Sequence, residues 1–108
     1  MAQIPEIEPA ELKARRDRGE NPHVLDVREP EEVAIAPFPG ATHIPMGEVP
    51  ARCGELDRAA EWIVVCHHGM RSAQVAIYLT RAGFARVVNL SGGIDAWSTD
   101  ADPATPRY

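Results

Sequence analysis

The sequence predicts an α/β fold in which short helices cover both faces of a parallel sheet. Apolar, β-branched runs at residues 23–27, 62–65 and 86–90 alternate with segments whose apolar residues recur at helical spacing. Proline and glycine residues mark the boundaries between these segments. Strands that alternate with helices in this way pair in parallel and are buried on both faces.

The first half of the chain is expected to contain three helices and two strands. Residues 8–19 indicate a helix, because Pro9 suits its first position and Gly19 its C-terminal stop. A buried strand follows at residues 23–27, directly after Asn-Pro. A short helix at residues 30–35 must end at the Pro-Phe-Pro-Gly run behind it. Two weaker elements complete this half: a brief strand at residues 41–44, and a turn with a short helix at residues 47–56.

The second half repeats the alternation. Residues 62–65 are expected to form the central strand. A helix at residues 73–82 follows, with its apolar residues on one face, and Gly83 ends it. After the strand at residues 86–90, Gly92-Gly93 is expected to turn the chain into a last helix that carries Trp97.

The length of 108 residues fits one domain with one core. We expect a single domain over residues 1–108, with its core at about residues 8–100. Residues 101–108 contain two prolines and show no periodicity, so they are expected to lie as a tail along the surface.

Composition excludes several classes of function. A net charge of −5 argues against a nucleic-acid-binding protein. No apolar run approaches the ~20 residues of a membrane span. The first six residues lack the basic and apolar regions of a secretory signal. Two cysteines do not make a disulfide framework, so we expect a reduced, cytoplasmic protein.

One run of residues carries the chemistry: Cys66-His67-His68-Gly69-Met70-Arg71-Ser72. It directly follows the central strand, and ligand sites in parallel sheets lie at the carboxyl ends of strands. The backbone N–H groups of such a loop can point at the cysteine sulfur. That environment favours the thiolate, which is the nucleophilic form of cysteine.

Three segments resemble the rhodanese family of sulfurtransferases. They are residues 24–29 with the Pro-Gly-Ala-Thr-His-Ile-Pro run at 39–45, the loop at residues 66–72, and residues 89–97. The resemblance implies a rhodanese-like fold with a central parallel sheet of five strands. In one place the chain departs from the family, which often has a histidine just before the Pro-Gly-Ala segment, where this chain has Pro37-Phe38.

The resemblance also implies an activity. Cys66 would take sulfane sulfur from thiosulfate or a similar donor and hold it as a persulfide. It would then pass the sulfur to a thiol, to cyanide or to an acceptor protein, in a ping-pong reaction. No metal and no organic cofactor is implied. The loop residues expected to bind the substrate and the persulfide are His67, His68, Gly69, Met70 and Arg71.

Arg71 has two possible roles, to hold an anionic donor or to brace the loop by pairing with Asp26. Asp26 and Arg28 bracket Val27 at a strand end, so both side chains can face the same side. We expect them to form a structural brace, with Asp26 directed toward the loop and Arg28 toward Glu31 or Glu32. Direct contact of Arg28 with the substrate is the less favoured alternative.

The remaining loop residues are expected to have supporting roles. Gly69 would adopt a backbone conformation closed to other residues, so that its N–H faces the sulfur. Ser72 would be the N-cap of the following helix. The adjacent His67 and His68 would point in different directions, so that at most one lines the pocket, and a metal site formed by the pair is not expected. Both histidines and Met70 would shape the mouth of the site.

Cys53 lies in Ala-Arg-Cys-Gly-Glu-Leu on the expected short helix. Packing as a small apolar side chain is the favoured interpretation. Resolution of a persulfide into a disulfide is the alternative.

Three rival functions remain. Phosphatases and arsenate reductases of related fold carry a Cys-x5-Arg loop, whereas this chain has the shorter Cys-x4-Arg, and no general acid is evident. A non-catalytic binding module is less favoured because the cysteine is present. The third rival is a persulfide carrier that serves a partner protein, docked over the two histidines and Met70.

Overall fold

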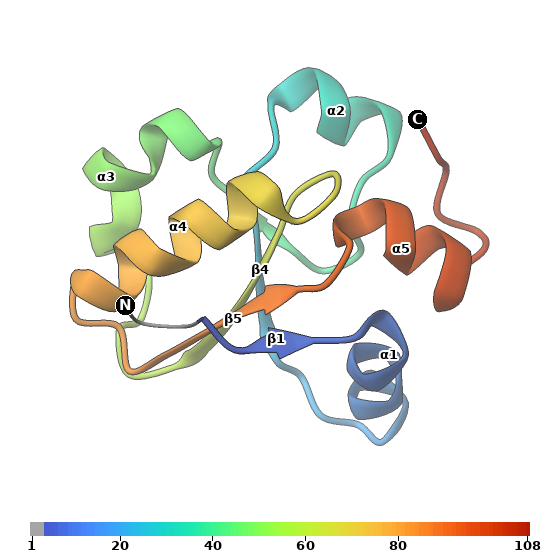
Figure 1. Ribbon diagram of the computed structural model, residues 1–108, viewed down its shortest axis with the longest axis horizontal. Helices are drawn as coiled ribbons and strands as arrows, with labels where there is room; N and C mark the ends of the chain where they lie inside the picture. Colours follow the sequence, from blue (N-terminus) through green and yellow to red (C-terminus); the bar gives the residue numbers. More distant parts are fainter. Residues whose placement is uncertain (1–3) are drawn as a thin grey trace.

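The computed structural model describes residues 4–108 and confirms the predicted α/β class. Five parallel strands form one sheet in the order β1-β5-β4-β2-β3, with β4 at its centre (Figure 1). The strands are β1 (Glu6–Ile7), β2 (His23–Asp26), β3 (Thr42–His43), β4 (Glu61–Val65) and β5 (Arg86–Leu90). The five-stranded sheet implied by the family resemblance is therefore present.

Five α-helices connect the strands. They are α1 (Pro9–Asp17), α2 (Pro30–Ile35), α3 (Val49–Arg52), α4 (Met70–Arg81) and α5 (Gly93–Asp100). Two 3₁₀ turns, Met46–Glu48 and Cys53–Glu55, flank α3. Helices α3 and α4 lie on one face of the sheet and α1 and α5 on the other (Figure 1).

Alternation along β4 divides the core into two halves. Trp62, Val64 and Cys66 face the half that α3 and α4 cover, and Ile63 and Val65 face the half that α1 and α5 cover. Both faces of the strand are thereby buried, as its continuous apolar run predicts. The same alternation directs the Cys66 side chain toward the start of α4.

One strand was missed, and the start of one helix lies three residues before its predicted position. Strand β1, which pairs with β5, was not predicted, because two residues are too few to show a strand period. Helix α4 begins at Met70 instead of residue 73, because Gly69 precedes it in a left-handed conformation that starts the helix early. None of the helices within residues 4–108 has the length and apolarity needed to span a membrane.

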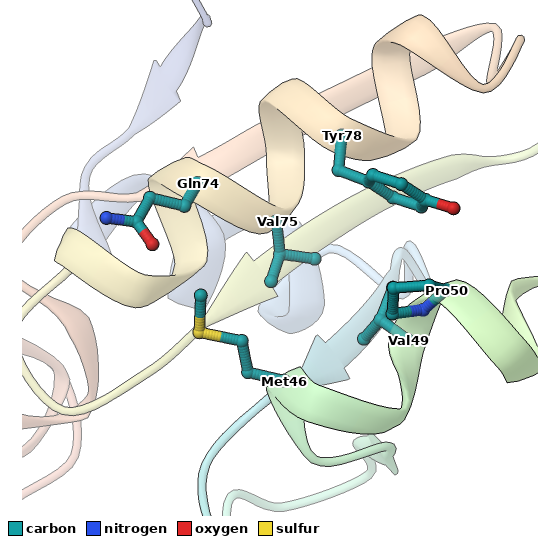
Figure 2. A pocket seen from close by; sticks show the side chains of 6 residues that line it. All are labelled: Met46, Val49, Pro50, Gln74, Val75 and Tyr78. Atoms are coloured by element: carbon teal, nitrogen blue, oxygen red, sulfur yellow. The ribbon is translucent and has the colours of Figure 1, made fainter.

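An apolar hollow of about 150 Å³ lies between α4 and the α3 segment. Figure 2 shows the side chains that line it: Met46, Val49, Pro50, Gln74, Val75 and Tyr78. No charged or thiol group lines this hollow, whereas Cys66 lies at the carboxyl edge of the sheet.

Candidate active site

Cys66 lies directly after β4 and is buried, with 1% of its surface exposed. Its sulfur accepts a hydrogen bond from the backbone N–H of Gly69 at 3.0 Å. Gly69 has a φ of +104°, a backbone conformation that residues other than glycine rarely adopt. The N–H that faces the sulfur is therefore held by a conformation that requires glycine, as the sequence predicts.

Ser72 is not the N-cap of α4; the N-cap is Gly69. Because the helix begins early, Ser72 lies within its first turn and is completely buried. Its hydroxyl lies 3.3 Å from the Cys66 sulfur and donates to Asn89 Oδ1 at 2.5 Å. Asn89 Nδ2 in turn donates to the carbonyl of Gly69 at 3.1 Å, so this β5 side chain holds Gly69 and Ser72, the middle and the end of the loop.

The start of α5 packs against the backbone of the loop. The N–H of Ile94 donates to the Cys66 carbonyl at 2.8 Å, and that of Asp95 donates to the His67 carbonyl at 3.1 Å. Gly93, with a φ of +65°, lies so close that a Cβ atom there would meet both carbonyl oxygens at 2.4–2.5 Å. The Gly-Gly pair therefore positions the loop as well as starting the helix.

Asp26 and Arg28 face the same side of the chain, as expected, but they pair with each other. Arg28 Nη2 lies 2.7 Å from Asp26 Oδ2, and both side chains are buried. The expected direction of Asp26 toward the loop is wrong, because side chains two residues apart at a strand end already meet. Arg28 does reach Glu32, as one of the two expected partners, but through the backbone carbonyl at 3.4 Å and not through the carboxylate. Arg28 is 0% exposed, so it has no surface for substrate contact.

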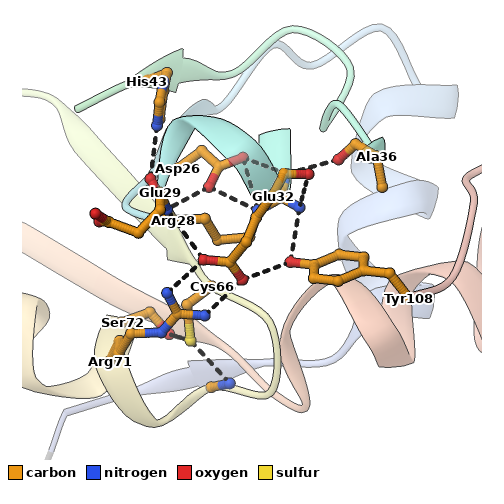
Figure 3. Close-up of polar contacts among 11 residues, drawn as sticks. Asp26, Arg28, Glu29, Glu32, Ala36, His43, Cys66, Arg71, Ser72 and Tyr108 are labelled. Carbon is orange, nitrogen blue, oxygen red and sulfur yellow. Dashed lines mark hydrogen bonds and ion pairs between the residues drawn. The ribbon is translucent and has the colours of Figure 1, made fainter. Parts of the chain in front are cut away.

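Arg71 braces the loop through Glu32 instead of Asp26. Its two terminal nitrogens donate to the two carboxylate oxygens of Glu32 at 2.7 and 2.8 Å (Figure 3). These bonds lower the pKa of Glu32 to about 2 and raise the pKa of Arg71. The sequence could not select this partner, because Asp26, Glu31 and Glu32 all lie near the same end of the sheet.

The two histidines of the loop do not diverge. Their rings stack with centroids 3.9 Å apart, and the ring of Tyr108 stacks on His67 at 4.0 Å with an interplanar angle of 10°. His68 and Met70 are largely exposed, at the mouth where the sequence places them. Offset stacking is a favourable arrangement for flat rings of this kind, so the two histidines stack instead of pointing apart.

The tail at residues 101–108 is more than a surface segment. Ala101 and Thr105 are buried, and the Tyr108 hydroxyl donates to Glu32 Oε2 at 2.8 Å while it accepts from Arg28 Nη1 at 3.0 Å. No periodicity in the tail indicates this contact. The only signal is an aromatic residue at the end of a polar segment.

His67, His68 and Asp95 offer ligand atoms within 4.8 Å of one another. One observation opposes a metal ion there. Arg107 pairs with Asp95 at 3.1 Å and supplies the positive charge that a cation would bring.

Cys53, in contrast, packs in the hydrophobic core. It is 7% exposed, belongs to the core beneath α4, and its thiol lies 3.8 Å from the Pro50 carbonyl. Both cysteines are free. The environment favours the packing interpretation of Cys53.

The Arg71–Glu32–Tyr108 cluster makes stability depend on pH at both extremes. Because the pKa of Glu32 is lowered to about 2, its contribution is present above pH ~4.5 and is lost as pH falls toward 2. Burial raises the pKa of Tyr108 to about 12, so its contribution is present below pH ~10 and is lost between 10 and 12. Urea unfolding between pH 5 and 2 is expected to show a steeper loss for the wild type than for Glu32→Gln. A Glu31→Gln control should follow the wild type, and equal slopes for all three proteins would contradict the assignment.

Comparison with known proteins adds to this geometry. The family model described as "Rhodanese-like domain" matches residues 8–100. "Putative sulfurtransferase YtwF" of Bacillus subtilis (strain 168) is 42% identical over 101 residues, which cover 94% of this chain and 97% of that protein. "Thiosulfate sulfurtransferase GlpE" of Pseudomonas entomophila (strain L48) is 34% identical and covers 90% of this chain and 87% of its own.

A comparison with solved structures supports the same family. A rhodanese-like domain protein from Staphylococcus aureus superposes with a TM-score of 0.85 at 31% identity, covering 97% of this chain and 99% of that one. Fold, length and relatives together support a sulfurtransferase of the rhodanese type.

Proposed function

Because this chain belongs to the rhodanese-like domain family, we propose that it is a sulfurtransferase that carries sulfane sulfur as a persulfide on Cys66. One observation carries the proposal: the Cys66 sulfur, at the end of the central strand, accepts the Gly69 N–H at 3.0 Å beside the first turn of α4. The Gly69 N–H and the first turn of α4 place positive potential where the transferred, anionic sulfur would lie.

The first step is attack of the Cys66 thiolate on the outer sulfur of the donor. With thiosulfate, a new S–S bond forms at Cys66, the S–S bond of the donor breaks, and its electron pair leaves with sulfite. The total charge of −3 is the same on both sides. In the second step an acceptor removes the outer sulfur; cyanide leaves as thiocyanate, and the Cys66 thiolate is regenerated.

The protein's contribution is electrostatic. The persulfide and the transferring sulfur are anionic, and the Gly69 N–H and the start of α4 offer positive potential beside them. Cyanide, small thiols and a protein thiol are all suitable acceptors in this chemistry. His68 and Met70 form the exposed rim that an acceptor would meet first.

The proposal is tested by intact mass after incubation with excess thiosulfate and, in parallel, with the methanethiosulfonate anion. We expect a gain of one sulfur, about 32 Da, that cyanide or dithiothreitol reverses. Cys53→Ser is the matched control and should gain the same mass, whereas Cys66→Ser should gain none. A gain that persists in Cys66→Ser, or no gain with either donor, would refute the proposal.

A further inference from the structure

We infer that Glu32 determines which sulfur donors this site accepts, because its carboxylate occupies the guanidinium group that an anionic donor would use. The inference rests on the proposed function and names its donor class. Sulfane-sulfur compounds with one negative charge or none are favoured over dianions such as thiosulfate.

Glu32 fills the binding geometry of Arg71. Both terminal nitrogens of the guanidinium group donate to Glu32, at 2.7 and 2.8 Å. This paired arrangement is the one by which arginine binds two oxygens of a carboxylate, a phosphate or a similar oxyanion. A thiosulfate that bound Arg71 through two oxygens in this same end-on arrangement would need the same two nitrogens, so donor and Glu32 compete for that side of the guanidinium group.

Glu32 is held firmly in this position. Besides Arg71, its carboxylate accepts the backbone N–H of Glu29 at 3.0 Å and the hydroxyl of Tyr108 at 2.8 Å. Tyr108 is fixed in turn by the buried Arg28 (Figure 3). Its ring also stacks on His67. With four donors around it, the carboxylate is satisfied and does not leave Arg71 without cost.

The other arginines of this network offer no substitute charge. Arg28 is paired with Asp26 in the interior, and Arg107 is paired with Asp95. Within residues 4–108, the three guanidinium groups around the loop thus each face a carboxylate. What remains for a donor is the Gly69 N–H and the N-terminal start of α4. A second negative charge on the donor adds repulsion from Glu32 without a new attraction.

The test compares two donors that differ in charge. Thiosulfate is a dianion, and methanethiosulfonate (CH3SO2S⁻) is a monoanion that loses methanesulfinate when Cys66 takes its outer sulfur. With cyanide as acceptor, thiocyanate formation gives kcat/KM for each donor. Glu32→Gln keeps the size and the acceptor oxygen of the side chain but removes its charge. Glu31→Gln, on the exposed side of α2, removes the same charge away from Arg71.

In Glu32→Gln we expect the ratio of kcat/KM for thiosulfate to that for methanethiosulfonate to rise about fivefold, mostly through a lower KM for thiosulfate. In Glu31→Gln the ratio should stay at the wild-type value. Equal losses for both donors in Glu32→Gln would overturn the inference, because Glu32 would then only position Arg71. An unchanged ratio would overturn it as well.

Calorimetric titration with sulfite separates this inference from the proposed function. Glu32→Gln should bind sulfite about fivefold more tightly than the wild type, whether or not the protein turns over. If neither donor placed sulfur on Cys66, the proposed function would fail, and the sulfite affinities would still decide the role of Glu32. Equal sulfite affinities would refute the competition.

Discussion

Replacement of Gly93 by alanine is expected to lower the free energy of unfolding by about 2–5 kcal/mol and to slow sulfur transfer to Cys66. Two costs add. A φ of +65° strains any residue with a Cβ atom, and that atom would lie 2.4–2.5 Å from the backbone of Cys66 and His67. Backbone cannot rotate aside as a side chain can, so α5 or the loop must move. Guanidinium-induced unfolding measures the loss of stability, and the rate at which the protein gains sulfur mass measures the slower transfer.

Substitutions at two other glycines distinguish the cost of the positive φ from the cost of the close contact. Gly19 has a φ of +85° with open space around it, so Gly19→Ala should show only the conformational cost, about 1–2 kcal/mol. Gly54 has neither a positive φ nor a close neighbour, and Gly54→Ala should be nearly neutral. A loss in Gly93→Ala no larger than that in Gly19→Ala would contradict the close packing of α5 on the loop.

The loop shows what a sequence can predict about such a site. The relation between Cys66 and Gly69 lies within one short segment, so local geometry and glycine chemistry are enough to place an N–H at the sulfur. The buried strand before the loop can also be predicted from the sequence, because its apolar run leaves few other interpretations. The number of strands came from the family resemblance, and no local pattern indicated their order.

The partners of the loop could not be predicted in the same way. Asn89, Glu32 and Tyr108 reach it from β5, α2 and the tail, and nothing in their local sequence signals the contact. Ser72 was misplaced because the left-handed Gly69 starts α4 earlier than the apolar spacing indicates. For Arg71, three carboxylates were within plausible reach, and only the packed side-chain directions select Glu32.

The brace at the end of β2 leads to the second large effect. Arg28→Met is expected to destabilise the fold by about 3–5 kcal/mol, because it leaves the Asp26 carboxylate buried without its counter-charge. Asp26 would keep only the backbone N–H of residue 28, at 3.1 Å. The variant also removes the donors to the Ala36 carbonyl and to Tyr108, so the end of α2 and the tail lose their anchor.

The control is an arginine with equally short ion pairs at the surface. Arg52 pairs with Glu48 at 2.9 Å and with Glu55 at 3.1 Å, but water solvates all three groups. Arg52→Met should therefore change the midpoint of guanidinium unfolding little. The double variant Asp26→Asn with Arg28→Met should recover part of the loss, because the amide carries no charge to leave unpaired. If Arg28→Met were as mild as Arg52→Met, the pair would contribute no more than a surface salt bridge. If the double variant were as unstable as Arg28→Met alone, the loss would come from the missing anchors and not from the buried charge.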